Sequence, residues 1–256
     1  MRGPRVTIAT VTWKLSRAGQ RLAAAMRRDG VRGLSTEAAR LTGEFSRVPV
    51  ALAAEYVFDL RRGIRTRGFV RNDQQLAGIS VGGDPNYYQP IGLPLLRRLA
   101  STVPVDRPTT TFVDLGAGRG RAVILAAELG FGRVLGVELD GELAAEGADN
   151  VRRWQSSRRG RRLEEQQVDV IQGDAAATTL PEGPLVIALF NSFGPSTLRL
   201  MLGNLCADRK NPKDPVFFAY INPVHEDTLE EFPRLVPFSR GRGWAVYRLE
   251  PELASA

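Results

Sequence analysis

The sequence is poor in cysteine, histidine and lysine, and it lacks long hydrophobic runs. Its single cysteine, Cys206, excludes an internal disulfide and a metal site built from several cysteines, so we expect no bound metal. No apolar stretch approaches the length of a membrane-spanning helix, which favours a cytoplasmic protein without a membrane span. Only three of the 35 basic residues are lysines, as a GC-rich genome would produce.

The overall composition is that of a globular protein with one core. Hydrophobic residues make up 43% of the 256 residues and charged residues 25%, which are ordinary values for folded domains. A chain of this length can build one sizeable α/β core with an appendage, but it is too short for two full catalytic domains.

Basic charge is concentrated in the N-terminal part. Residues 1–75 contain 15 basic and 6 acidic side chains, a net charge of +9, whereas the remaining residues carry −2. Residues 13–26 have the apolar spacing of an amphipathic basic helix, and further helical stretches follow up to residue 60. We therefore predict a basic helical extension over residues 1–75 and the main domain over residues 76–256. The extension fits a contact with nucleic acid or an acidic partner and, equally, a solvated arginine-rich surface.

The run from Thr111 to Arg121 predicts a buried strand, a tight turn and a helix. Phe112, Val113 and Leu115 form a short apolar run of the kind found in parallel sheets that are covered on both faces. Three glycines then occupy every second position, where they allow positive φ and the close approach of a ligand to the main chain: Gly116, Gly118 and Gly120.

This turn departs from a dinucleotide-binding fingerprint at two places. The third glycine of that fingerprint would fall at position 121, which is Arg121. Asp114 ends the strand beside the place where a pyrophosphate would bind, and its carboxylate would repel phosphate. The same carboxylate would favour a positively charged ligand such as S-adenosylmethionine (SAM). An NAD(P)-dependent oxidoreductase is therefore disfavoured.

Two further predicted strands also end in acids. Residues 133–140 end in acids about 20 residues after the glycines, where doubly wound folds position a carboxylate for ribose hydroxyls, and Glu138 is the candidate. Residues 168–172 form the next strand, which leads into Gly173, Asp174 and Ala175. The Asp174 carboxylate can accept a hydrogen bond from an amino group of a ligand. It can equally cap a following helical turn.

Taken as a set, these motifs resemble the successive cofactor motifs of the class I SAM-dependent methyltransferases, over roughly residues 75–250. The runs 189–194 and 220–225 further resemble a bacterial branch of that family whose substrates are mostly unassigned. The resemblance implies SAM as the cofactor. The cofactor-binding residues that it implies are Asp114, Gly116, Gly118, Gly120, Glu138, Asp174, Ala175 and Asn191.

The resemblance also implies roles for two more segments. It implies that the Tyr-x-Pro element at Tyr88 folds over the methionine end of SAM, although the loop could also be a surface turn. Residues 58–68 match a segment that precedes the main domain in the same branch, with Arg65 where an acid is usual. A simple turn before the core is the alternative for this segment.

The predicted catalytic candidates are Asn191, His225 and Tyr88. Asn191 follows the strand at residues 184–190, at the edge where open α/β sheets bind ligands, so we expect the methyl acceptor there. His225 follows the strand at residues 216–221 and, as the only histidine, is the natural general base. Alternatively, His225 begins a helix and bonds to its own loop.

The whole pattern predicts an α/β fold with a doubly wound, mostly parallel seven-stranded sheet, a closing antiparallel hairpin and the N-terminal helical extension. We predict a SAM-dependent methyltransferase that transfers a methyl group to a heteroatom, with a lean towards nitrogen, of a small molecule or protein. The alternative is a SAM-pocket module without catalysis, whose basic N-terminal segment binds nucleic acid or an acidic partner.

Overall fold

The computed structural model describes residues 54–67, 70–71, 87–88, 93–163, 165–190, 193–210 and 212–252. The chain divides into two compact units, Met1–Phe58 and Asp59–Ala256, and the second contains the sheet. The predicted basic helix at residues 13–26 lies outside the described residues, and the N-terminal boundary at residue 75 stays a prediction. A helix over residues 54–60 is described where the predicted helical stretches end.

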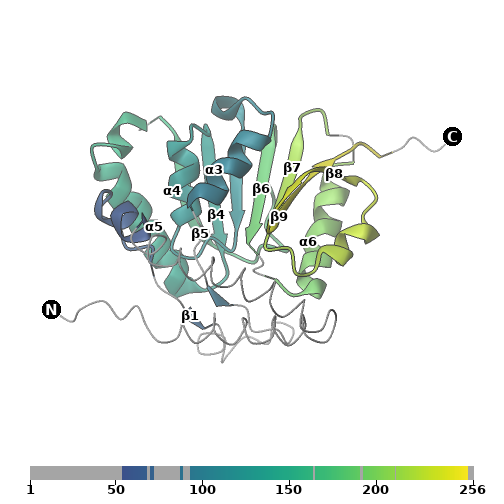
Figure 1. Cartoon of the computed structure of the whole chain (residues 1–256), viewed down its shortest axis with the longest axis horizontal. Coiled ribbons are helices and arrows are strands. Elements are labelled where there is room, and N and C mark those ends of the chain that lie inside the picture. Colours follow the sequence, from purple (N-terminus) through teal and green to yellow (C-terminus); the bar gives the residue numbers. More distant parts are fainter. Residues whose placement is uncertain are drawn as a thin grey trace, which may run out of the picture. The chain divides into compact units, whose positions relative to one another are not determined.

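Within the described residues, one sheet has seven strands in the order β5-β4-β3-β6-β7-β9-β8 (Figure 1). All neighbours are parallel except β9, which runs antiparallel to both β7 and β8. The predicted mostly parallel sheet with a closing hairpin is therefore confirmed. The strands are β3 (Thr111–Leu115), β4 (Arg133–Glu138), β5 (Gln167–Gln172), β6 (Leu185–Phe190), β7 (Val216–Ile221), β8 (Leu235–Gly241) and β9 (Trp244–Leu249).

The chain winds outward from β3 in both directions, which makes the two ends of the parallel strands different. β3 lies between β4 and β6, so the order of the strands reverses at this point. In open α/β sheets, ligands bind at the carboxyl ends of the strands beside such a reversal. The fold therefore directs attention to the residues that follow β3, β4 and β6.

Helices cover both faces of the sheet, as a doubly wound fold requires. They are α3 (Leu93–Thr102), α4 (Arg121–Glu128), α5 (Gly141–Ser156) and α6 (Pro195–Asp208), with short 3₁₀ helices η1 (Arg107–Thr109), η2 (Gly160–Leu163) and η3 (Glu226–Glu231). Leu135 and Val137 of β4 share a buried cluster with residues of α6. Gly136, between them, faces Val123 of α4. Because successive strand residues point to opposite faces, α4 and α6 lie on opposite sides of the sheet.

A two-stranded antiparallel ribbon precedes α3. It consists of β1 (Val70–Arg71) and β2 (Tyr87–Tyr88), in which Val70 pairs with Tyr88 and Arg71 with Tyr87. The ribbon joins the segment that follows residue 59 to Tyr88, one of the predicted site residues. It was not predicted, because strands of two residues leave no alternating pattern in a sequence.

Candidate functional site

The glycine turn between β3 and α4 has the backbone conformation that its glycines predict. Gly116, Gly118 and Gly120 have φ values of 84°, 50° and 77°, in the left-handed region that residues with a Cβ avoid. The amide N–H groups of Gly116 and Ala117 both donate to the carbonyl oxygen of Val137, at 2.8 and 3.0 Å. The turn is therefore folded directly against the carboxyl end of β4.

Glu138 completes this attachment with its side chain. Its Oε2 accepts a hydrogen bond of 2.7 Å from the Gly118 N–H, and its Oε1 accepts one of 3.0 Å from the Asp140 N–H. A carboxylate has about four acceptor positions, so Glu138 keeps capacity to accept from a ligand. Three successive amide N–H groups of the turn thus donate to β4, so they are not free to donate to a phosphate.

Asp114 and Glu138 are two desolvated carboxyl groups beside the turn. Asp114 is only 6% exposed, and burial, reinforced by the charge of Glu138, raises the pKa of its carboxyl to about 7. Burial also raises the pKa of Glu138, while the hydrogen bonds from Asp140 and Gly118 act in the opposite direction. Two desolvated carboxyl groups at adjacent strand ends favour a ligand that brings positive charge.

Two glycines outside the turn allow its close packing, and the sequence reasoning missed both. A Cβ on Gly136 would lie 2.7 Å from the Ala117 Cβ, and a Cβ on Gly147 would lie 2.7 Å from the Gly118 carbonyl oxygen. Gly136 is in the middle of β4 and Gly147 in the middle of α5, where glycine is unfavourable. Their positions inside a predicted strand and a predicted helix could have identified both glycines, since an interior glycine often marks a close backbone approach.

Asp174 lies at the same edge of the sheet, one strand further out. Gln172, the last residue of β5, pairs with Glu138, and the Gly173 N–H donates to the Glu138 carbonyl at 2.9 Å. The Asp174 side chain is exposed, and its Oδ1 accepts a 2.9 Å hydrogen bond from the Ala176 N–H. This is the turn-capping role that the sequence allowed. The buried Ala175 follows it.

The structure describes the three predicted catalytic residues to different extents. Asn191 lies outside the described residues. Tyr88 is in β2, where its backbone pairs with Val70. His225 precedes η3 and is partly buried, and its backbone N–H donates to the Tyr220 hydroxyl at 3.3 Å. Because β6 separates β7 from β3, His225 follows a strand that is two positions away from Asp114.

Asn222 is a further residue at the carboxyl end of β7. Among the described residues it is the only non-glycine with positive φ, at 50°, and its N–H donates to the Gly243 carbonyl at 2.8 Å. Asparagine tolerates this conformation better than most residues, and such conformations cluster at functional sites. The sequence places Asn222 in the run that resembles the bacterial branch, but it was not among the predicted site residues.

The described part of the chain shows neither a metal-binding cluster nor a membrane-spanning helix. No group of three or more His, Cys, Asp or Glu side chains there could hold a metal ion. A membrane-spanning helix is also not found among those residues, because none of their helices is both long and apolar enough.

Comparisons with known proteins give matches among solved structures. No family model and no curated protein matches the chain. An RNA methyltransferase from Salinibacter ruber, in complex with S-adenosyl-L-homocysteine, is 21% identical with a TM-score of 0.40; the match covers 66% of this chain and 97% of that one.

Two further matched structures are also named as methylases. A ribosomal protein L11 methylase from Lactobacillus delbrueckii subsp. bulgaricus is 18% identical, with a TM-score of 0.41 and coverage of 62% of this chain and 78% of that one. A predicted N6-adenine-specific DNA methylase from Listeria monocytogenes is 14% identical, with a TM-score of 0.47 and coverage of 67% and 53%. The chain is similar to these proteins.

Proposed function

We propose that this chain is a SAM-dependent methyltransferase whose cofactor lies at the carboxyl ends of β3 and β4. The observation that carries the proposal is the pair of desolvated carboxyl groups, Asp114 and Glu138, beside a turn that contains three positive-φ glycines. SAM brings an ammonium and a sulfonium group, and it has ribose hydroxyls that donate to carboxylates. These residues fit that ligand in both charge and hydrogen-bonding capacity.

The same contacts argue against a dinucleotide. A pyrophosphate needs free amide donors and a positive potential at the turn. Here the amides of Gly116, Ala117 and Gly118 bond to Val137 and Glu138, and two carboxyl groups adjoin them. A phosphate group would have to displace these bonds and approach negative charge, so the oxidoreductase interpretation is not retained.

In the proposed complex, each residue has one task. Asp114 attracts the cationic end of SAM, and Glu138 accepts hydrogen bonds from the ribose hydroxyls. Asp174, with the Ala175 backbone beside it, accepts a hydrogen bond from the adenine amino group. It does so with the carboxylate oxygen that does not cap its own turn. The Tyr88 ring packs against the sulfonium, because aromatic faces attract cations. The glycines Gly116, Gly118 and Gly120 leave room for the ligand against the main chain.

The protein's contribution to methyl transfer is mainly alignment. SAM supplies an activated methyl group, and holding an acceptor in line with it can be worth about 7–11 kcal/mol. We infer that Asn191 fixes the acceptor by accepting its N–H, which is the reason for the lean towards nitrogen on a small molecule or protein. His225 takes up a proton if the acceptor must lose one.

Calorimetry on the full chain with SAM, S-adenosylhomocysteine and NAD tests the proposal. We expect SAM and S-adenosylhomocysteine to bind and NAD not to bind. Binding of NAD alone would overturn the proposal, and SAM binding without turnover of any offered acceptor would favour the non-catalytic module.

Replacement of the ribose carboxylate gives the sharper prediction. Glu138→Ala leaves the ribose hydroxyls without their acceptor, and each buried unpaired donor costs about 1–3 kcal/mol. We expect this variant to lose most of its SAM affinity in a calorimetric titration. Its circular dichroism and melting curve serve as the control for folding, and unchanged affinity in a folded variant would contradict the assignment of Glu138.

A further inference from the structure

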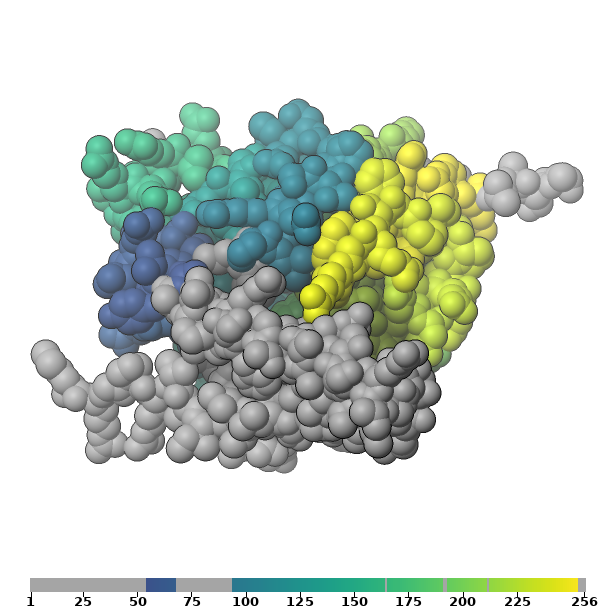
Figure 2. Space-filling view, viewed as in Figure 1, coloured from purple at the N-terminus to yellow at the C-terminus, as the bar shows by residue number. Residues whose placement is uncertain are grey.

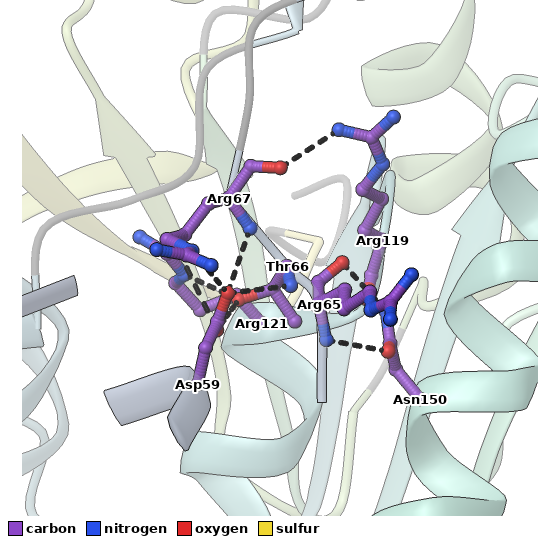
Figure 3. Close-up of polar contacts among 7 residues, drawn as sticks. All are labelled: Asp59, Arg65, Thr66, Arg67, Arg119, Arg121 and Asn150. Carbon is purple, nitrogen blue, oxygen red and sulfur yellow. Dashed lines mark hydrogen bonds and ion pairs between the residues drawn. The ribbon is translucent and has the colours of Figure 1, made fainter. Parts of the chain in front are cut away.

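A buried polar cluster ties residues 59–67 to the start of α4. Asp59 and Thr66 are 1% and 0% exposed, and they belong to the segment that leads to β1. The Thr66 hydroxyl donates to Asp59 Oδ1 at 2.6 Å, while Asp59 Oδ2 accepts the backbone N–H groups of Thr66 and Arg67 at 3.0 and 3.1 Å. Figure 3 shows these contacts converging on the Asp59 carboxylate.

Arg121 reaches into this cluster from the first position of α4. Its side chain is 1% exposed, its Nε donates to the Thr66 hydroxyl at 2.8 Å, and its NH2 lies 3.9 Å from Asp59 Oδ1. Arg121 directly follows Gly120, the last glycine of the turn. A buried guanidinium is costly unless it is paired, so this contact fixes where α4 can begin.

A second set of bonds holds the same segment beside the turn. The Asn150 side chain, 3% exposed in α5, accepts the Arg65 N–H at 2.9 Å and donates to the carbonyl oxygens of Arg65 and Arg119, both at 3.1 Å. Arg119, between two glycines of the turn, donates through NH1 to the Arg67 carbonyl at 2.9 Å. In the space-filling view, the segment (blue) forms part of the molecular surface (Figure 2).

We propose that Asp59, Thr66 and Arg121, here called the brace, are positioning residues that hold the glycine turn in its cofactor-binding conformation. The Thr66 hydroxyl is the central group, because it donates to Asp59 and accepts from Arg121 at the same time. The inference rests on the proposed function, since the turn is taken to bind SAM. It gives Arg121 a reason to be present where a dinucleotide fingerprint would have glycine.

The arginines near the brace do not by themselves suggest a separate anion site. A pocket of about 380 Å³ is lined there by Arg65, Arg67, Arg119, Glu146, Asp149, Asn150 and Arg153. Of these arginines, Arg119 pairs with Glu146, Arg153 lies 3.8 Å from Asp149, and Arg67 lies 3.2 Å from Asp59. Most of the positive charge is therefore matched by carboxylates of the protein.

The test compares three threonine variants of the full chain. Thr66→Val keeps the shape but removes the hydroxyl, and Thr66→Ser restores it. Thr110→Val is the matched control, because Thr110 is also buried, at 1% exposed, and its hydroxyl donates to the Asp106 carbonyl at the opposite end of β3. SAM affinity is measured by calorimetry, folding by thermal melts, and amide hydrogen exchange is followed over residues 116–121 without ligand.

We expect Thr66→Val and Thr110→Val both to lower the melting temperature. Only Thr66→Val, which removes two buried hydrogen bonds beside the turn, should weaken SAM binding, by about tenfold. Thr66→Ser should bind like the wild type. Exchange at residues 116–121 should accelerate in Thr66→Val alone. A folded Thr66→Val protein with wild-type affinity and wild-type exchange would overturn the brace, as would an equal loss of affinity in Thr110→Val.

Failure of the brace and failure of the proposed function give different results. If the wild type does not bind SAM, the proposed function fails, and the exchange comparison still decides whether the brace orders the turn. If Thr66→Val does not fold, Thr66→Ala replaces it, because it also removes the hydroxyl that bonds to both Asp59 and Arg121. Normal affinity and exchange in a folded Thr66→Ala protein would then overturn the inference.

Discussion

Asp114 is the single residue whose ionisation should matter most for a cationic ligand. Its carboxyl has a pKa of about 7 because of burial and the neighbouring Glu138. This pKa is raised above the usual value, so the folded state holds its proton more tightly than the unfolded state. Protonated Asp114 therefore adds to the free energy of unfolding when the pH falls below about 7. This stabilisation is lost again as the pH rises to about 7.

Ligand binding should have the opposite dependence on pH. A cationic ligand favours the ionised form of Asp114, so we expect SAM affinity to fall about tenfold between pH 7 and about pH 5.5, as the carboxyl takes up a proton. Calorimetric titrations at a series of pH values would measure it. Asp114→Asn should bind SAM more weakly and without this slope, and a slope that persists in that variant would assign the effect to another group.

Gly147 offers a test of the packing behind the turn. In Gly147→Ala the new Cβ would lie 2.7 Å from the Gly118 carbonyl oxygen and 3.0 Å from Val170 Cγ1, so α5 or the turn must move. We expect a loss of about 1–3 kcal/mol in unfolding free energy, as in other overpacked sites, together with weaker SAM binding.

The matched control is Gly203→Ala in α6. There the added Cβ would meet only Phe232 Cε1, at 4.0 Å, so alanine should be tolerated and should favour the helix. Urea unfolding and SAM titration of both variants separate general helix effects from contact with the turn. Equal behaviour of the two variants would show that Gly147 is not needed for the approach of α5.

At the scale of secondary-structure elements, α5 begins with a side-chain cap that also lies next to Glu138. Asp140 Oδ1 accepts the Leu143 N–H at 2.9 Å. Asp140→Ala should destabilise the protein by about 1 kcal/mol through loss of this cap, whereas Asp140→Asn keeps an acceptor and should lose much less. Urea unfolding measures both. Equal stability of the two variants would mean that the cap contributes nothing.

The sequence was informative wherever an element carries its own local pattern. The strands β3, β6, β7 and β9 consist mostly of apolar residues, and Asp114 and Glu138 could be located by their places near strand ends. Bonds between distant segments leave no such pattern. Arg121 and Thr66 are 55 positions apart, and Arg65 and Asn150 are 85 apart, so the structure was needed to explain them. In the sequence, Arg121 was only a departure from a fingerprint.

At the scale of the whole molecule, charge is the property that distinguishes the N-terminal part from the sheet. Residues 1–75 carry +9 and the rest −2, while the described cofactor residues all follow residue 87. If the basic part recognises the acceptor, deletion of residues 1–30 should leave SAM affinity largely intact and reduce methylation. Calorimetry and an assay of methyl transfer to candidate acceptors would measure the two quantities separately.

A nucleic-acid role for the same segment makes a different prediction. Full-length protein would then bind RNA or DNA with an affinity that falls as salt rises, and deletion of residues 1–30 would reduce the slope by about one unit for each phosphate contact removed. A truncated protein that binds SAM, methylates its acceptor and ignores nucleic acid as the full-length chain does would contradict both roles. In that case the charge of residues 1–30 would serve only to keep an arginine-rich surface solvated.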